Sequence, residues 1–421
     1  MSMNTASPSL HRNLVFLYIF QATSRLWFDG ALWVVYWQHR GLTLFEVGLL
    51  EALLHLVSLT LDIPMGIFAD RIGWKVSLML SGVAGAIYCF CSLLPHPFVA
   101  GMLAFAFRGL QITMSNGSDM AMTYETVKAS GNVHRYQIIS GRMMATQLIS
   151  LGMAEALGGY FASQSWVLVY GAFGVANLLS SVCTLFLKTP VTKNQGHGAT
   201  TGDSVTESDR PSFLQIVQDA YQFAKFSSSY RRWIAYSATL SGIIATCAFY
   251  GQSLLHGSGW STGEIGLLTG LECGMSALAS VASQPITCRF GARTLAGLAV
   301  FGMLLFSWLP GAGKGIGYLF SQASGSAAEP LIDRNLNDLV PSSSRATLLS
   351  ANSTAFSLFM VIGFPLFGAL IGSVGIQSAY HWGSILLATC AAVAGIALGL
   401  TSRKQTTFEQ TTASFSHHPE D

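Results

Sequence analysis

The chain has 421 residues, of which 51% are hydrophobic and only 10% are charged, with a formal net charge of +2. Soluble domains carry about 25% charged residues, so this composition excludes an ordinary soluble protein. The small net charge also excludes a strongly basic nucleic-acid-binding surface. We therefore expect an integral membrane protein in contact with the lipid bilayer.

Apolar stretches of roughly 20 residues recur along the whole chain, and each can cross a hydrocarbon core of about 30 Å as a helix. The polar stretch 189–229 divides these stretches into six before it and six after it. We predict twelve transmembrane helices, at residues 14–37, 46–68, 75–94, 98–127, 137–162, 166–187, 232–255, 263–287, 295–310, 315–339, 346–372 and 376–400.

The predicted fold class is an all-α membrane protein with two pseudo-symmetric six-helix bundles. The expected domain boundaries are an N-terminal bundle at 1–188, a linker loop at 189–229, a C-terminal bundle at 230–402 and a polar tail at 403–421. The seven cysteines all lie within or at the ends of apolar stretches and lack metal-site spacing, so we expect free thiols, no metal and no cofactor.

Basic residues predict the orientation of the chain in the membrane. With the N-terminus in the cytoplasm, the 22 Lys and Arg residues fall in or beside cytoplasmic segments, except Arg25, Arg40, Arg108 and Lys314. Both termini and the linker are therefore expected in the cytoplasm. The chain starts with a polar segment that is not a secretory signal, and its short termini are typical of a bacterial inner membrane protein.

The two halves of the chain resemble each other in sequence. The stretch EVGLLEALL begins at Glu46 and EIGLLTGLE begins at Glu264, 218 positions later. Three such matches occur in the same order in corresponding spans; the paired positions are Arg71 and Arg289, Gly73 and Gly291, Lys75 and Arg293, Gly117 and Gly325, Ser118 and Ser326, Glu125 and Asp333, Arg135 and Arg345, Ser140 and Ser350, and Gly158 and Gly368. Duplicated halves are common in transporters, whose substrate sites lie between the halves near the bilayer midplane.

The stretch GIFADRIGWK, Gly66–Lys75, is predicted to form the cytoplasmic loop between the second and third spans. Gly66 would let two helices approach closely, and Gly73 would permit the turn. Asp70 and Arg71 can cap helix ends and pair across the loop, while Lys75 follows the positive-inside bias. An ordinary charged turn is the alternative. The degenerate copy QPITCRFGARTL at the matching loop of the second half argues against it.

This stretch resembles the loop signature G-x-L-A-D-R-x-G-R-K of the major facilitator superfamily. Six positions match, namely Gly66, Ala69, Asp70, Arg71, Gly73 and Lys75, while Phe68 and Trp74 differ. The resemblance extends to the 6 + 6 arrangement of spans. It implies that Asp70 contacts a neighbouring helix and helps to hold the outward-facing state.

Two further signatures of proton-coupled efflux members are matched in part. Arg108 and Gln111 match the pattern R-x-x-Q-G, which implies a role for Arg108 in proton transfer. Gly158 and Gly159 match the end of the pattern G-P-x-x-G-G, but Glu155 stands where that pattern has proline. We expect Asp62, Glu155, Gly158 and Gly159 to lie at a gate or a helix contact. The repeat places Pro365 opposite Glu155.

Charged residues within predicted spans are expensive in a bilayer and usually face a cavity or a partner. The set comprises Arg25, Asp29, Glu51, Asp62, Arg108, Asp119, Glu155, Glu272 and Glu329, with Gln111 and Ser115 between Arg108 and Asp119 on one polar stripe. Seven carboxyl groups share the span interior with two arginines. They cannot all be ionised, so some are expected to hold protons near neutral pH, as proton coupling requires.

Each candidate also has a structural alternative. Arg25 and Asp29, four residues apart on one predicted helical face, could form an intrahelical pair. Asp62 is expected in the loop network with Asp70 and Arg71. A scaffold role is open for Arg108, gate or scaffold roles for Glu51 and His55, and buried helix contacts for Glu155 and Glu272.

The residues predict a secondary transporter, not an enzyme, because no catalytic constellation is visible. We expect a monomer that moves a small organic solute, with protons as the coupling ion and Arg25, Asp29, Arg108, Gln111, Asp119 and Glu329 as coupling or binding residues. The excess of acids favours export of a neutral or cationic compound. A proton-linked importer of a small metabolite and a membrane receptor or scaffold that transports nothing are the alternatives.

Overall fold

The computed structural model describes residues 8–129, 135–188, 222–223, 225–340 and 345–385, and throughout these ranges the regular secondary structure is helical. The helices are α1 (Pro8–Ser24), α2 (Trp33–His39), α3 (Leu44–Ile72), α4 (Trp74–Ser92), α5 (Pro97–Ser115), α6 (Ser118–Ala129), α7 (Tyr136–Gln164), α8 (Trp166–Leu185), α10 (Ser228–Gly257), α11 (Thr262–Val281), α12 (Ser283–Trp308), α13 (Ala312–Leu339) and α14 (Arg345–Val374). Residues 376–385 are also helical. Most of the predicted linker 189–229, the tail 403–421 and the end of the twelfth span lie outside the described residues.

The helices correspond in order to the first eleven predicted spans and the start of the twelfth, so the predicted all-α membrane fold is confirmed. Within the part of the chain that the structure describes, six helical segments are long and apolar enough to cross a membrane. They are Leu44–Ile72, Trp74–Ser92, Pro97–Ala129, Trp166–Leu185, Ser228–Gly257 and Ala351–Val374.

Two predicted spans are not continuous helices. The first span breaks after Ser24, and residues 25–32 form turns before α2 begins at Trp33. The fourth span breaks at Asn116 and Gly117, where Gly117 has a φ of +76°, a conformation that favours glycine. Both spans read as uninterrupted helices in the sequence because apolar residues flank each break.

The loop predicted between the eighth span (263–287) and the ninth span (295–310) is also wrong. The chain turns at Ala282 instead, and α12 runs from Ser283 through that region. Pro285 stands in the first turn of α12, where proline is tolerated because its missing N–H would have no helical partner there.

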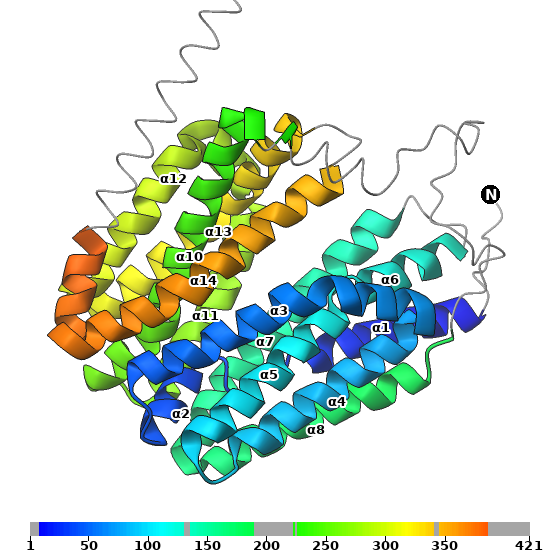
Figure 1. Cartoon of the computed structure of the whole chain (residues 1–421), viewed down its shortest axis with the longest axis horizontal. Coiled ribbons are helices and arrows are strands. Elements are labelled where there is room, and N and C mark those ends of the chain that lie inside the picture. The colour runs from blue at the N-terminus through cyan, green and yellow to red at the C-terminus, as the bar shows by residue number, and fades with distance from the viewer. Residues whose placement is uncertain (1–7, 130–134, 189–221, 224, 341–344, 386–421) are drawn as a thin grey trace, which may run out of the picture.

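The chain forms two groups of helices, an N-terminal half (α1–α8) and a C-terminal half (α10–α14). Two helix pairs hold them together: α7 packs against α11, which we call the first seam, and α3 packs against α14, which we call the second seam. Figure 1 shows α3 and α14 diverging from this contact toward Ile72 and Arg345. The halves therefore meet at one end of the molecule and separate at the other.

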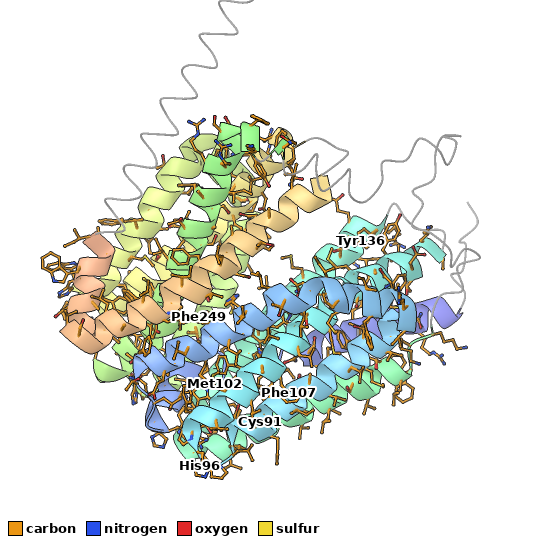
Figure 2. The ribbon with its side chains drawn as sticks, in the orientation of Figure 1. Cys91, His96, Met102, Phe107, Tyr136 and Phe249 are labelled. Carbon is orange, nitrogen blue, oxygen red and sulfur yellow. The ribbon has the colours of Figure 1, made fainter. Side chains whose placement is uncertain are left out.

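Figure 2 marks the two ends on the N-terminal half: His96 lies at the end where the halves meet, the seam end, and Tyr136 lies at the opposite, open end. Aromatic packing joins the halves near the seam end. The rings of Trp33 and Phe249 are 5.5 Å apart, and those of Trp33 and Phe364 are 6.1 Å apart.

Glycines bring the seams into backbone contact. A Cβ atom added at Gly159 would lie 2.9 Å from Gly266 Cα, and one at Gly270 would lie 2.6 Å from the Gly152 carbonyl oxygen. In the second seam, a Cβ atom at Gly48 would lie 2.7 Å from Pro365 Cα. Small residues of this kind allow membrane helices to pack closely.

The internal repeat is visible in the caps of α3 and α11. Thr43 and Glu46 form a capping box in which the Thr43 N–H donates to Glu46 Oε2 at 2.8 Å and the Glu46 N–H donates to Thr43 Oγ1 at 3.2 Å. Ser261 and Glu264 form the same box with the same two distances. The matched segments thus begin with the same local structure, as a duplication predicts.

Candidate functional site

A cavity of about 620 Å³ lies between the two halves. Residues of α3, α5, α7, α10, α11, α13 and α14 line it, together with Gly30 from the turns at 25–32. Gly30 and Phe249 lie at the deep end, near the seams. Glu329 and Asp333 on α13 are exposed, as is Asp62 on α3, so the cavity is accessible from the open end.

The cavity wall is acidic and polar. Its carboxyl groups come from both halves and belong to Asp62, Glu155, Glu272, Glu329 and Asp333. Neutral polar side chains include Ser58, Asn116, Gln252, Gln322, Asn352 and Ser353, and the aromatic ones are Phe249, Tyr318 and Phe356. No Lys or Arg occurs among the described residues that line the cavity. The described wall therefore carries an excess of acidic groups over basic ones.

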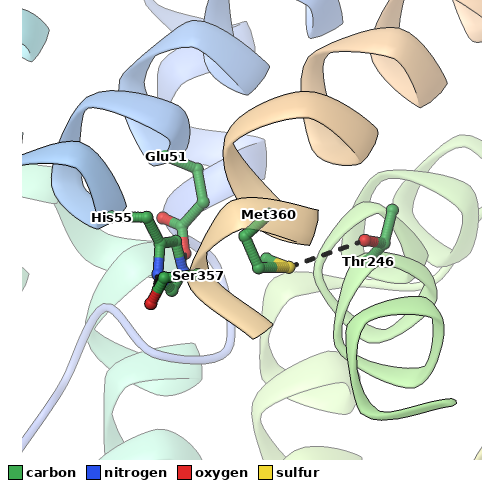
Figure 3. Close-up of polar contacts among 5 residues, drawn as sticks. All are labelled: Glu51, His55, Thr246, Ser357 and Met360. Atoms are coloured by element: carbon green, nitrogen blue, oxygen red, sulfur yellow. Dashed lines mark hydrogen bonds and ion pairs between the residues drawn. The ribbon is translucent and has the colours of Figure 1, made fainter. Parts of the chain in front are cut away.

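His55 is the one basic side chain among these lining residues, and it bridges the second seam (Figure 3). Its Nε2 atom lies 3.4 Å from Glu51 Oε1, one turn earlier on α3. Its Nδ1 atom lies 3.3 Å from Ser357 Oγ on α14. Glu51 is buried, so His55 supplies the polar partner that this carboxyl group needs.

Three of the predicted site residues lie inside the N-terminal half. Asp29 is 3% exposed and accepts a hydrogen bond from the Tyr88 hydroxyl group. Arg108 donates to Gln111 Oε1 at 2.8 Å, and Gln111 Nε2 donates to Asn177 Oδ1 at 2.7 Å. This buried polar cluster connects α4, α5 and α8 with the turns at 25–32, and it is separate from the described lining of the cavity.

Aromatic rings surround the charge of Arg108. Its guanidinium carbon lies 4.1 Å from the centre of the Trp27 ring and 5.2 Å from that of Phe173. Such cation–π contacts stabilise a desolvated cation. Sequence reasoning did not find the roles of Tyr88, Asn177 and Trp27, because these residues come from distant spans and carry no local signal.

The predicted intrahelical pair of Arg25 and Asp29 is wrong. Helix α1 ends at Ser24, so the two residues do not share a helical face. The Arg25 guanidinium carbon instead lies 5.1 Å from the centre of the Trp27 ring, while Asp29 contacts Tyr88.

Asp119 lies at the start of α6, on a chain of polar contacts that joins three spans. Its Oδ2 atom accepts from Gln21 Nε2 at 3.1 Å, and the Gln21 side chain accepts from Gln147 on α7. Its Oδ1 atom accepts from the Met120 N–H at 2.7 Å, and a carboxylate is favoured near a helix N-terminus.

Glu329 is the member of the predicted coupling set that lines the cavity. Asp62 also lines the cavity, which differs from its expected place in a loop network with Asp70 and Arg71. The difference arises because α3 continues through Asp70 to Ile72, so that Asp62 lies nearly three turns before the end of the helix.

The loop signature is mostly helical. Gly66, Asp70 and Arg71 belong to the last turns of α3, and the turn itself is made by Gly73, whose φ is +108°. A Cβ atom added at Gly66 would have no neighbour within 4 Å, so the expected close helix approach at this glycine is wrong. Asp70 Oδ1 accepts from Trp74 Nε1 at 3.2 Å.

Lys75 joins the signature to the last turn of α8. Its Nζ atom donates to the carbonyl oxygens of Leu185 at 2.8 Å and Leu187 at 2.9 Å. A cation is favoured at a helix C-terminus, where carbonyl groups lack helical partners. This interaction attaches the start of α4 to the end of α8.

Gly158 and Gly159, expected at a gate or helix contact, lie at backbone contacts near the seam end. A Cβ atom at Gly158 would lie 1.8 Å from the Phe28 carbonyl oxygen, and one at Gly159 would lie 2.6 Å from that of Thr262. Glu155, one turn before Gly159, lines the cavity beside them.

Comparisons with known proteins agree with this architecture. The profile of the Major Facilitator Superfamily matches residues 14–256. The MFS-type transporter YxaM of Bacillus subtilis (strain 168) is 22% identical over 376 residues, which cover 83% of this chain and 86% of that protein.

Solved structures show the same fold at low sequence identity. The nucleoside transporter NupG superposes with a TM-score of 0.68 at 14% identity over 93% of this chain and 98% of that chain. A bacterial homologue of the human lysosomal transporter Spinster, in an inward-facing and unoccupied conformation, gives 0.67 at 15% identity over 96% and 98%. A D-xylose–proton symporter gives 0.64 at 15% over 93% and 96%. With its profile match across more than half of its length, the chain belongs to the major facilitator superfamily of membrane transporters.

Proposed function

We propose that this transporter is a proton-coupled exporter of neutral or cationic organic solutes that works by alternating access. The observation that carries the proposal is the acidic cavity between the halves, which has carboxyl groups from both halves and no Lys or Arg among its described lining residues. Such a wall attracts organic cations and provides groups that can gain and lose protons.

The arrangement of the seams supports alternating access. The halves touch at the seam end and separate at the open end, which is the arrangement of one of two alternating states. In the proposed motion, the bundles at 1–188 and 230–402 rock about the cavity as units. Under the orientation that the basic residues favour, the open end, both termini and the linker would face the cytoplasm of a bacterial cell, and this state would load solute from inside.

We propose two sets of coupling residues. Glu329 would meet the solute directly because it lines the cavity. The buried cluster of Asp29, Arg108 and Gln111, with Arg25 and Asp119 nearby, would respond to protonation by rearranging the N-terminal half. Its buried charges and hydrogen bonds make it sensitive to the gain or loss of one proton.

Transport by purified protein in vesicles tests the proposal. Vesicles with an imposed pH gradient would receive tetraphenylphosphonium as a cationic probe, or uridine or D-xylose as neutral probes, while an internal dye records pH. We expect at least one probe to move protons in the direction opposite to itself, with a slower rate in Asp119→Asn. The absence of proton movement with every probe, and identical behaviour of Asp119→Asn, would contradict the proposal.

Proton-linked import of a small polar metabolite is the second candidate. The Ser, Asn and Gln side chains of the cavity could bind hydroxyl groups, and two of the similar folds are named as a nucleoside transporter and a D-xylose–proton symporter. The same vesicles separate the candidates, because an importer moves the neutral probe and protons in the same direction.

A further inference from the structure

Two carboxyl groups face one another across the first seam. Glu155 of α7 is 9% exposed, and its Oε2 atom lies 3.6 Å from the Cys273 thiol of α11. The same thiol lies 3.9 Å from Glu272 Oε2, and Glu272 Oε1 accepts from Ser276 Oγ at 2.7 Å. A single sulfur atom thus contacts one carboxyl group from each half of the transporter.

The backbone contacts of the seam hold this carboxyl pair, Glu155 and Glu272, in place. A Cβ atom at Gly266 would lie 2.6 Å from the carbonyl oxygen of Glu155 itself. On the other side, Gly152 and Gly270 approach equally closely, with 2.6 Å between the Gly152 oxygen and a Cβ at Gly270. The backbones that carry the two carboxyl groups are therefore held close together by the packing of α7 on α11.

Among the described residues, the surroundings of the pair offer no cation to balance two negative charges. The titratable groups that face it are Asp29 from the turns at 25–32, Tyr318 from α13 and Cys273 itself. From α10, the neutral Gln252 Nε2 donates to the Gly30 carbonyl oxygen at 2.8 Å, beside Glu155. No Lys or Arg lines the described part of the cavity next to the pair.

We propose that the pair of Glu155 and Glu272 is the proton-dependent contact that closes the first seam. With a proton on the pair, at most one negative charge lies at the seam and the helices pack. When the proton leaves, two carboxylates face each other in a poorly solvated contact, and their repulsion favours separation of α7 from α11. Both residues line the cavity, so the proton can leave toward the open end. This inference rests on the proposed proton coupling and names the residues that perform it.

The proton-dependent contact proposed for the first seam has no counterpart in the second seam. At the repeat offset of 218 positions, His55 takes the place of Cys273, and the repeat places Pro365 opposite Glu155. The buried acid of the second seam, Glu51, contacts His55 at 3.4 Å and therefore has a basic partner. Loss of protons therefore brings two facing carboxylates together at the first seam, whereas the acid of the second seam faces His55.

Hydrogen–deuterium exchange at several pH values tests the proposal without a known solute. The readout is exchange of backbone amides in peptides covering residues 150–164 and 262–276, corrected for the intrinsic effect of pH on exchange. If opening of the seam releases one proton, the corrected exchange of the wild-type protein should rise by about tenfold per pH unit over the range where the pair titrates. In the double variant Glu155→Gln/Glu272→Gln it should stay flat.

Glu51→Gln is the matched control, because it removes a buried acid from the second seam and should leave the wild-type pH slope at the first seam intact. Should the double variant not fold, each single variant should also give a flat profile, because one remaining carboxyl group cannot place two negative charges at the seam. A flat wild-type profile, or an unchanged slope in the double variant or in both single variants, would overturn the inference.

The vesicle experiment separates failure of this inference from failure of the proposed function. Proton movement with a probe in vesicles, combined with an unchanged slope in the double variant, would place coupling elsewhere and leave proton-coupled transport standing. A slope that is lost in the double variant, without proton movement with any probe, would support the proton-dependent seam and contradict coupled transport.

Discussion

Gly158 on α7 is in direct contact with the backbone of Phe28, in the turns that interrupt the first span. A Cβ atom at Gly158 would lie 1.8 Å from the Phe28 carbonyl oxygen and 2.7 Å from its carbonyl carbon. The contact therefore requires glycine, and it holds the segment that carries Asp29 against α7.

Gly158→Ala should destabilise the protein. The added methyl group cannot fit unless α7 or the turns at 25–32 shift, and overpacking of this kind costs about 1–3 kcal/mol. A lower thermal unfolding midpoint of the purified variant would show this cost. Gly171→Ala on α8 is the matched control, because no atom lies within 4 Å of the added methyl group there. Equal midpoints for both variants would contradict the close contact.

Arg108→Lys should also lower stability, although it keeps the positive charge. Lysine cannot reproduce the planar stacking of the guanidinium group on Trp27 together with the hydrogen bond to Gln111. We expect a loss of about 1–3 kcal/mol, measured as a lower unfolding midpoint. Arg334→Lys, at an exposed ion pair with Asp338, should have little effect. If Arg108→Lys unfolds at the wild-type midpoint, the stacking and hydrogen bond of Arg108 contribute little to the stability of the protein.

Glu329→Gln should weaken binding of tetraphenylphosphonium without changing stability. Glu329 is exposed in the cavity, where one charge–charge interaction is worth about 1 kcal/mol, or about fivefold in affinity. Isothermal titration of the purified protein measures the change. Asp338→Asn removes a carboxyl group from the same helix outside the cavity lining and should keep wild-type affinity. Equal affinity of the two variants would exclude Glu329 from cation binding.

Thr43→Ala and Ser261→Ala should have matching effects because their capping boxes are equivalent. Each change removes the hydroxyl group that accepts from the backbone N–H of the third helical residue. Loss of such a cap costs about 1 kcal/mol. Thermal unfolding should therefore show similar decreases for both, and no decrease for the exposed Ser163→Ala. A decrease in one variant alone would argue against equivalent roles of the two caps.

The spans, their order and the duplication could be predicted from the sequence, because each depends on local composition or on a fixed offset. The apolar stretch at 46–68 predicted α3 to within a few residues, and the match between Glu46 and Glu264 predicted duplicated halves, whose matched helices begin with the same capping box. Local patterns carry this information directly.

The arrangement of the charged residues could not be predicted in the same way. The partners of Asp29 and Gln111 are Tyr88 and Asn177, which are 59 and 66 positions away, respectively, on other helices. Glu155 meets Cys273 across 118 positions and between the two halves. Hydropathy shows that such residues need a partner, but the packing of the helices decides which partner each one meets.

The break of the first span was missed for a related reason. Residues 25–32 have ordinary helix-compatible composition, and their turns are stabilised by tertiary contacts, such as that between Phe28 and Gly158 and that between Asp29 and Tyr88. Tertiary contacts of this kind override the weak preference of these residues for a helix.

Distances between the two halves at the open end and at the seam end test the central claim, alternating access linked to protons, most directly. Spin labels introduced as unnatural amino acids would replace Ile138 and Val281, which are exposed at the open end, and in a second protein Ser163 and Ser258, which are exposed near the seam end. Pulsed electron resonance would give both distances at pH 6 and pH 8.5. The account predicts that the seam-end distance grows and the open-end distance shrinks as pH rises. Two distances that stay constant, or that change in the same direction, would contradict it.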